Sequence, residues 1–193
     1  MNLGENIHNA FEIVAETYKN VYKLMSYCQE EAIEEGEFAL SSPKFLRWKS
    51  DNEIGGWLMK SFILLFQHSK DKLLKNQWRK GPVYVLEINL NPNDYDEPIV
   101  NIAKFIYNDV NSWGEGVSPA AHWIFADPLS NNNDIVEYEG DVSAYSGHIT
   151  DEVYSNRYWG LQRIIGIGVP LIDITRENAY ETIFGGFRSL IDK

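Results

Sequence analysis

An apolar stripe with helical spacing runs through the first 35 residues. Its members follow alternating steps of four and three residues: Ile7, Phe11, Val14, Tyr18, Val21, Met25, Cys28 and Ala32. Polar residues, mainly Glu, Lys and Asn, fill most positions between them, so the pattern predicts a long helix with one apolar face, starting at Asn6 and ending at Gly36. We expect this face to pack on a sheet of its own domain, and a homodimer through the N-terminal helix is the alternative.

After Gly36 the pattern changes to short apolar segments separated by turns. Residues 37–49 and 57–67 flank a turn that contains Gly55 and Gly56, although 57–67 is apolar on every side and also fits a buried helix. Further extended segments are predicted at 81–92, 98–107, 134–145 and 161–175. These segments indicate a sheet of at least five strands.

The C-terminal segment returns to helical spacing. Ala179, Ile183, Phe187 and Leu190 recur on one side, and Thr175 precedes them as a cap. The pair Gly185-Gly186 costs such a helix about 2 kcal/mol relative to Ala, so we expect a close packing partner there. Helix, strands and helix together predict an α+β fold in which residues 1–193 form a single domain. Its antiparallel sheet of five or more strands is flanked on one face by the long N-terminal helix and a C-terminal helix.

Composition narrows the cellular context. Of the 193 residues 44% are hydrophobic and 13% aromatic, which is enough for a globular core. The longest apolar runs, 62–66 and 164–172, are far shorter than the ~20 residues that span a bilayer. The acidic N-terminus lacks the features of a signal peptide, and the single cysteine, Cys28, cannot form an internal disulfide. We therefore expect a cytoplasmic protein with no membrane partner.

The net charge of -11 is distributed unevenly. Residues 44–80 hold nine Lys and Arg against three acidic residues, whereas residues 81–160 hold thirteen acidic residues against two basic ones. Residues 1–43 are also acidic. Blocks of opposite sign either neutralise each other within a fold or face separate partners, and the first arrangement is the more common.

A basic segment at Lys72–Gly81, KLLKNQWRKG, is the clearest candidate for anion binding. A short helix starting after Ser69 would place its cations on one side and Trp78 on the adjoining side. The candidate anion-binding residues are Lys72, Lys75, Arg79, Trp78, Arg47 and Lys49. The alternative is a solvated connector that offsets nearby acids, and the small energies of exposed ion pairs favour it.

Candidates for catalysis are few. None of the four histidines has the spacing of a helical zinc site, so the sequence predicts no metal and no cofactor. His148 begins a single His-Ile-Thr tripeptide, a motif that some phosphoesterases use in pairs, and a loop histidine is the simpler interpretation. Glu87 interrupts an apolar strand, so it requires a partner such as Lys104 or has a function. His148 and Glu87 are the two catalytic candidates.

Acidic residues form the candidate surface for a partner. Glu137, Glu139 and Asp141 alternate with apolar or small residues, which predicts a strand with a charged outer face, and Glu31 and Glu35 lie near a helix end. We expect a small acidic binding protein rather than an enzyme, one that neutralises or regulates a partner with a basic surface, as immunity-type inhibitors do. The alternative is a hydrolase or binder of a phosphate-bearing ligand, a nucleotide or nucleic acid, that uses the basic block 44–80.

Overall fold

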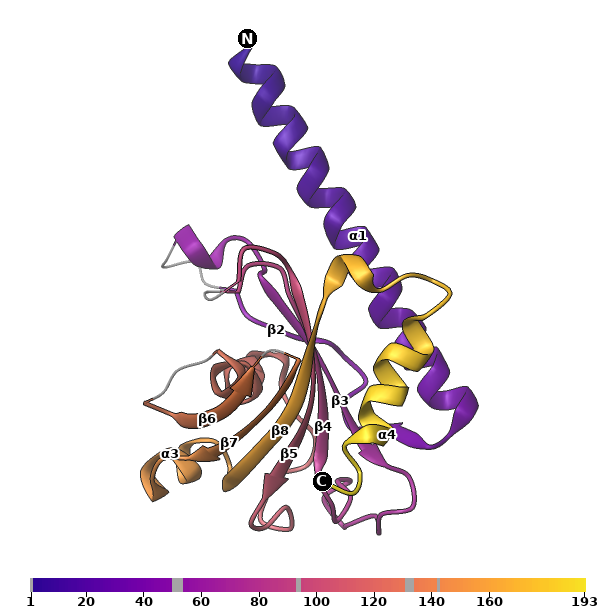
Figure 1. The fold of residues 1–193 in the computed structure, drawn as a ribbon, viewed down its shortest axis with the longest axis vertical. Helices are drawn as coiled ribbons and strands as arrows, with labels where there is room; N and C mark the ends of the chain where they lie inside the picture. Colours follow the sequence, from indigo (N-terminus) through magenta and orange to yellow (C-terminus); the bar gives the residue numbers. More distant parts are fainter. Residues whose placement is uncertain (1, 50–53, 93–94, 131–133, 142) are drawn as a thin grey trace.

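The structure, a computed structural model, describes residues 2–49, 54–92, 95–130, 134–141 and 143–193 (Figure 1). The strands are β1 (Phe38–Leu40), β2 (Leu46–Arg47), β3 (Ser61–His68), β4 (Val83–Asn89), β5 (Ile99–Tyr107), β6 (Val136–Asp141), β7 (Ala144–Ile149) and β8 (Leu161–Pro170). The α-helices are α1 (Leu3–Glu35), α2 (Trp123–Ala126), α3 (Glu152–Arg157) and α4 (Gly186–Ser189). Short 3-10 or π turns are η1 (Ile54–Gly56), η2 (Pro119–His122), η3 (Asp127–Leu129), η4 (Leu171–Asp173) and η5 (Glu181–Gly185).

The strands form one antiparallel sheet in the order β1-β3-β4-β5-β8-β7-β6, and β2 also pairs with β3. This confirms the predicted α+β fold with a long N-terminal helix, an antiparallel sheet and helical turns at the C-terminus. The central strands β3, β4 and β5 are buried along nearly their whole length because both faces of the sheet are covered. Among the described residues, no helix is long and apolar enough to cross a membrane.

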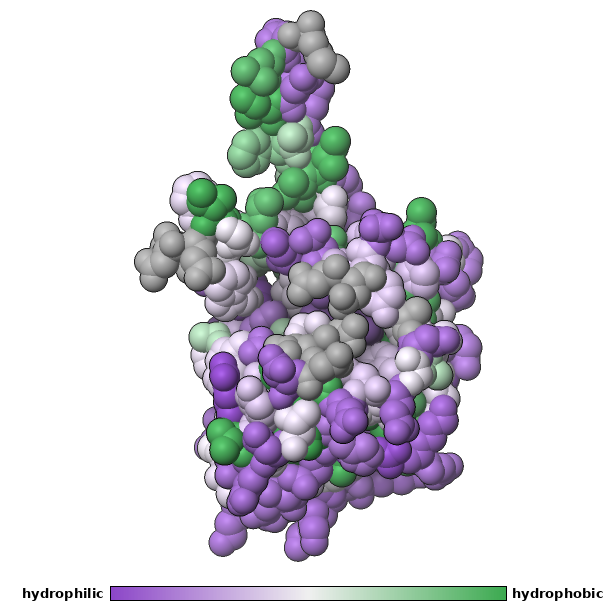
Figure 2. All heavy atoms as spheres, turned by 60° about the vertical axis from the view of Figure 1, so that its left-hand side comes forward, coloured by the Kyte–Doolittle hydropathy of each residue, from purple (hydrophilic) through white to green (hydrophobic). Residues whose placement is uncertain are grey.

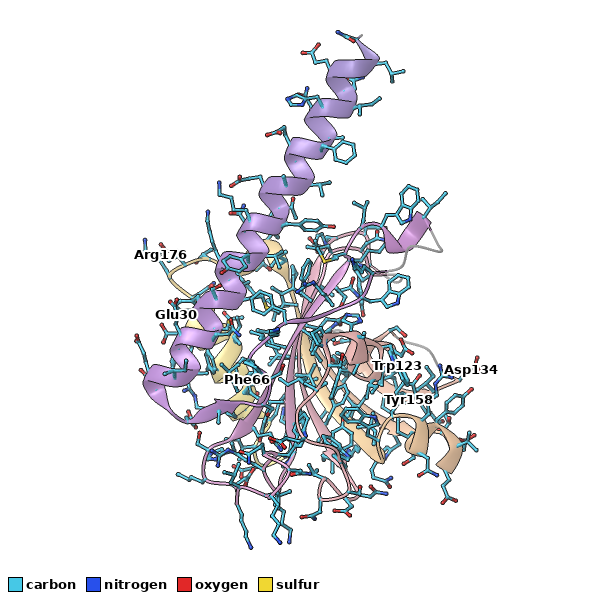
Figure 3. All side chains as sticks on the ribbon, turned by 180° about the vertical axis from the view of Figure 1, so that it is seen from behind. Glu30, Phe66, Trp123, Asp134, Tyr158 and Arg176 are labelled. Atoms are coloured by element: carbon cyan, nitrogen blue, oxygen red, sulfur yellow. The ribbon has the colours of Figure 1, made fainter. Side chains whose placement is uncertain are left out.

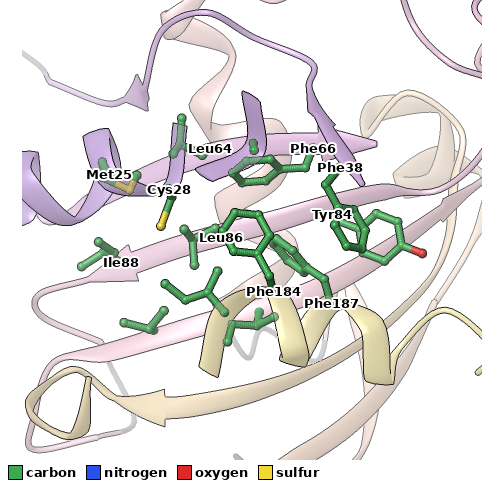
Figure 4. Close-up of a cluster of buried hydrophobic side chains, with 14 of the residues drawn as sticks. Met25, Cys28, Phe38, Leu64, Phe66, Tyr84, Leu86, Ile88, Phe184 and Phe187 are labelled. Atoms are coloured by element: carbon green, nitrogen blue, oxygen red, sulfur yellow. The ribbon is translucent and has the colours of Figure 1, made fainter. Parts of the chain in front are cut away.

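The second half of α1 and the C-terminal turns cover one face of the sheet, as predicted. Met25 and Cys28 of α1 lie over this face with Phe184 and Phe187 of η5 and α4, and the Phe66 ring is 5.8 Å from that of Phe184 (Figure 4). Aromatic pairs at this spacing add specific edge-to-face contacts to the burial of apolar area. This first core therefore holds both ends of the chain on the same sheet.

Two details explain how the C-terminal segment docks. A Cβ added at Gly186 would lie 3.1 Å from Ile102 Cγ2. The glycine therefore allows this segment to pack closely against β5, as the Gly185-Gly186 pair predicted. Lys104 of β5 is buried, and its Nζ donates to the carbonyls of Leu190, Ile191 and Lys193 at 2.9, 2.7 and 3.0 Å. A cation at this position stabilises the carbonyl groups at the C-terminal end of the helical turns.

The opposite face carries a second core beneath α2, α3 and the connecting segments. Trp123 lies 5.7 Å from Tyr158 between ring centroids on this side, whereas Phe66 points toward α1 (Figure 3). The predicted extended segment 134–145 is a hairpin of β6 and β7 rather than one strand. The Asp141 carboxylate accepts a 2.9 Å hydrogen bond from the Ser143 backbone, which stabilises a turn at that point.

The apolar stripe of α1 packs on the sheet along only part of its length. Val21 and Met25 are buried, but Ile7 and Phe11 are 53% and 67% exposed on the part of the helix that projects beyond the sheet (Figure 1). The expectation that the whole stripe packs on its own domain was therefore wrong for this part. The helix also begins earlier than predicted, because Asn2 rather than Asn6 accepts the capping hydrogen bond, while Gly36 ends it as expected.

We predict that Val21→Asp destabilises the fold and that Ile13→Asp does not. Val21 is 4% exposed in the first core, so an unpaired carboxylate there should lower the free energy of unfolding by several kcal/mol. Ile13 is 68% exposed on the same helix and serves as the matched control. Urea denaturation followed by circular dichroism measures both, and equal midpoints for the two variants would contradict the packing.

Candidate functional site

A group of polar side chains lies at one end of the second face, centred on Glu87 of β4. In the sheet Glu87 pairs with Ile63 of β3 and Asn101 of β5, and its exposed fraction is 2%. Because side chains alternate along antiparallel strands, Glu87 and Asn101 project to the same face. The polar chain therefore interrupts an otherwise apolar layer, which is the anomaly that the sequence showed at Glu87.

Hydrogen bonds join five residues into a chain that we call the Glu87 network. Ser61 Oγ donates to Glu87 Oε1 at 2.5 Å, and Asn101 Nδ2 donates to Glu87 Oε2 at 2.9 Å. His122, at the end of η2, places Nε2 at 2.8 Å from Ser61 Oγ. The Tyr145 hydroxyl of β7 extends the chain at 3.5 Å from Asn101 Oδ1. The network thus joins η2 to strands β3, β4, β5 and β7.

Burial sets the protonation states in this network. Desolvation raises the pKa of Glu87, although the hydrogen bonds from Ser61 and Asn101 oppose that shift. Desolvation also lowers the pKa of His122 to about 4, so its imidazole is neutral at pH 7. Since the Ser61 hydroxyl donates to Glu87, its oxygen accepts from His122, which must then carry its hydrogen on Nε2.

The order of the groups limits the chemistry of the network. In a Ser-His-Asp triad the histidine lies between the serine and the carboxylate and removes the serine proton. Here Ser61 lies between His122 and Glu87, so the arrangement can hold and pass a proton along the chain but does not activate a serine nucleophile in that way. Glu87 and His122 are both buried, which favours a structural role for the network.

The suggested pairing of Glu87 with Lys104 is wrong. Lys104 pairs with Tyr84 in the register, three positions along β5 from Asn101, and therefore projects to the opposite face of the sheet. It binds the C-terminal carbonyls instead. The hydrogen bonds that the structure gives the Glu87 carboxylate come from two neutral groups, the Ser61 hydroxyl and the Asn101 amide.

The second catalytic candidate, His148, lies apart from Glu87. It is an exposed residue of strand β7 rather than of a loop, between Glu137 of β6 and Arg163 of β8 in the register. Tyr145 of the same strand projects toward the Glu87 network, and a residue three positions later projects to the other face. The structure therefore does not bring His148 and Glu87 into one site.

The basic segment 72–81 is not a helix. Leu73 and Arg79 form an isolated antiparallel bridge, and Leu74 N donates to Trp78 O at 2.7 Å across a tight turn. Trp78 is 1% exposed and its indole donates to Gly114 O, so it belongs to the second core and offers no stacking surface. The guanidinium of Arg79 donates to two backbone carbonyls, those of Ser69 and Asp71.

The remaining anion-binding candidates are also dispersed. Arg47 of β2 lies opposite Phe62, near the start of β3, whereas the backbone of Arg79 contacts the Gln67 side chain near its end. Five residues of extended strand separate these points by about 17 Å. Lys49, Lys72 and Lys75 are exposed, with Lys49 close to Arg47 in the chain. The six candidate residues therefore do not form one cluster.

The acidic candidates divide into two groups. Glu137, Glu139 and Asp141 are exposed and alternate along β6, which is the last strand at one end of the sheet order. Glu31 and Glu35 lie near the end of α1, which packs by β1 at the opposite end of the order. Each group can contact a partner, but a single small interface cannot include both.

Sequence reasoning missed most of the Glu87 network. Asn101 gave a usable signal, since it is a polar residue inside the apolar segment PIVNIAKFIY. His122 and Ser61 gave none, because both lie at element ends where polar residues are ordinary. Tyr145 resembles any half-buried strand residue, and only the register places it near Asn101.

The described residues contain no group of three or more His, Cys, Asp or Glu side chains that could hold a metal ion. No family model, curated protein or solved structure matches the chain.

We predict different outcomes for two substitutions at Glu87. Glu87→Gln keeps the shape and removes a charge that burial disfavours, so the free energy of unfolding at pH 7 should change by no more than about 1 kcal/mol. Glu87→Ala leaves buried polar groups unpaired and opens a cavity, which should cost about 2–4 kcal/mol. Chemical denaturation measures both, and an equal loss in the two variants would show that the fold requires the charge itself.

We predict that His122 contributes to the acid sensitivity of the fold. Its pKa falls from 6.5 in the unfolded chain to about 4 in the folded one, so unfolding takes up a proton between these values. The stability from neutral His122 is complete above pH 6.5 and is lost as the pH falls toward 4, by about 3 kcal/mol. Denaturation of the wild type and of His122→Gln across this range should show a smaller loss in the variant, whereas parallel curves would refute the assignment.

Proposed function

We propose that the protein is a binding protein that neutralises or regulates a partner with a basic surface, and that the exposed acidic face of β6 is its contact surface. The observation that carries this proposal is the position of Glu137, Glu139 and Asp141 on the outermost strand at one end of the sheet. These three carboxylates follow one another at intervals of two residues, so they repeat about every 7 Å along the strand. This spacing suits a partner that presents cations along an extended surface.

The edge position supports a partner of opposite charge. Charged side chains on an edge strand prevent it from pairing with other strands until the charge is neutralised. A basic partner supplies that neutralisation and also benefits from the net charge of -11, which attracts cationic proteins over long distances. Both effects favour binding to a basic protein and weaken with added salt.

The placement of the other candidates favours binding over catalysis. The two catalytic candidates lie on different faces of the sheet, and the Glu87 network is buried and hydrogen-bonded within itself. Of the basic residues considered for a phosphate-bearing ligand, Arg47 and Arg79 lie near opposite ends of β3, and Trp78 is in the core. The β6 face, in contrast, is already exposed and requires no rearrangement to meet a partner.

We predict that neutralising the β6 face weakens binding to an oligolysine peptide and to basic proteins retained from a native lysate. The variant replaces Glu137 and Glu139 by Gln and Asp141 by Asn. Three exposed ion pairs of ~0.5 kcal/mol each correspond to about a tenfold loss of affinity, which calorimetry with the peptide measures.

A matched control separates a local contact from an effect of total charge. The substitutions Glu12→Gln, Glu30→Gln and Glu34→Gln remove the same number of exposed carboxylates from α1. The proposal requires this control to bind like the wild type at equal salt concentration. Equal weakening in both variants would mean that only the net charge matters and would overturn the assignment of β6.

A further inference from the structure

A groove runs beside α1, where the helix begins to project beyond the sheet. One wall is formed by residues between positions 17 and 27 of α1, and the other by the segment 171–179, which follows β8 and includes η4. The two segments lie side by side, and Arg176 belongs to the second wall (Figures 1 and 3). The groove has a volume of about 860 Å³, which is the size of a small-molecule site rather than of a packing defect.

The walls of the groove are mostly apolar. Their apolar residues are Val21, Leu24, Tyr27, Leu171, Ile174 and Ala179. Val21 and Ala179 are buried, and the other four are partly buried against the first core. The groove therefore exposes apolar surface at the edge of that core, and a ligand with an apolar body would remove this surface from water.

Two cations lie at the rim of the groove. Lys23 and Arg176 line it from opposite walls and are both exposed. Neither belongs to an ion pair within the described part of the chain, and Lys23 Nζ donates to Asn20 Oδ1 at 3.3 Å. The pKa of Glu177 is lowered by hydrogen bonds with its own backbone and with Thr175 and, more weakly, by Arg176, but Glu177 does not line the groove.

The charge of the groove is opposite to that of the whole protein. Of the lining residues that the structure describes, none is acidic, although the chain has a net charge of -11. A cationic rim above apolar walls is complementary to a molecule that has an anionic head and an apolar body.

We propose that the groove binds an anionic amphiphile, which is a molecule with a linear apolar chain and a carboxylate or phosphate head group. The chain lies between the two walls, and the head group contacts Lys23 and Arg176. The helical wall from Thr17 to Tyr27 is about 15 Å long, which suits an extended acyl chain of medium length. A guanidinium binds either head group through two parallel hydrogen bonds, so both classes of anion fit.

Contacts within the chain hold both walls in place. Thr175 N donates to Asn178 Oδ1 at 2.8 Å, and Asn178 Nδ2 donates to Asp173 O at 2.9 Å. Leu171 N donates to Pro98 O at 2.9 Å, just before β5, and the α1 wall rests on the first core. A site with fixed walls binds its ligand without the cost of ordering them.

The projecting part of α1 offers a less specific surface. Figure 2 shows hydrophobic residues along one side of the projecting helix. That face is a single wall, whereas the groove has two walls and cations at its rim. The groove therefore specifies both the apolar and the charged part of its ligand.

Calorimetric titration of the whole chain with dodecanoate and with dodecyl phosphate, below their micelle concentrations, tests the proposal. Both should bind at a single saturable site, and binding of only one of them would support the site and identify its head group. Dodecyltrimethylammonium has the same chain with a positive head group. It should bind more weakly, although the net charge of the protein alone would favour it. Octanoate should bind at least about tenfold more weakly than dodecanoate, because its shorter chain buries fewer CH₂ groups.

Paired variants locate the site. Lys23→Gln with Arg176→Gln should weaken the binding of dodecanoate about tenfold, since each exposed ion pair contributes modestly. Lys72→Gln with Lys75→Gln removes the same charge from exposed residues that do not line the groove, and it should bind like the wild type.

Three results would overturn the proposal: no saturable binding of either anion, tighter binding of the cation, or equal weakening in the two double variants. An acidic amphipathic peptide that binds where neither anion does would assign the groove to a protein partner and would overturn it as well.

Discussion

Burial of β3, β4 and β5 on both faces is the constraint on which the rest of the structure depends. Successive side chains of a strand point to opposite faces of the sheet. Because both faces are covered here, the polar residues within these strands enter one core or the other. Glu87 enters the second core and Lys104 the first, and their charges cannot meet. Each is satisfied separately, Glu87 by neutral side chains and Lys104 by backbone carbonyls.

The fold was predictable because its signals are local. The stripe of α1 and the β-rich segments 81–92 and 98–107 each show their period within one element. The helix predicted for KLLKNQWRKG is absent because a contact between residues distant in sequence overrides the local helical spacing. Trp78 is buried against Trp113, with ring centroids 4.9 Å apart, and this packing determines the shape of the segment. The Glu87 network depends on register and on η2, which no single segment encodes.

The two ends of the sheet differ in their exposure to solvent. At the β1 end, α1 and the C-terminal turns cover the strands, and Arg188 bridges Glu37 and Glu181 there at 3.3 and 3.0 Å. At the β6 end the acidic face is exposed. At the covered end Arg188 therefore pairs with two acidic residues of the chain, whereas the carboxylates of β6 are exposed. Part of the charge at the β1 end is thus paired within the chain, and the proposed partner would neutralise the charge at the β6 end.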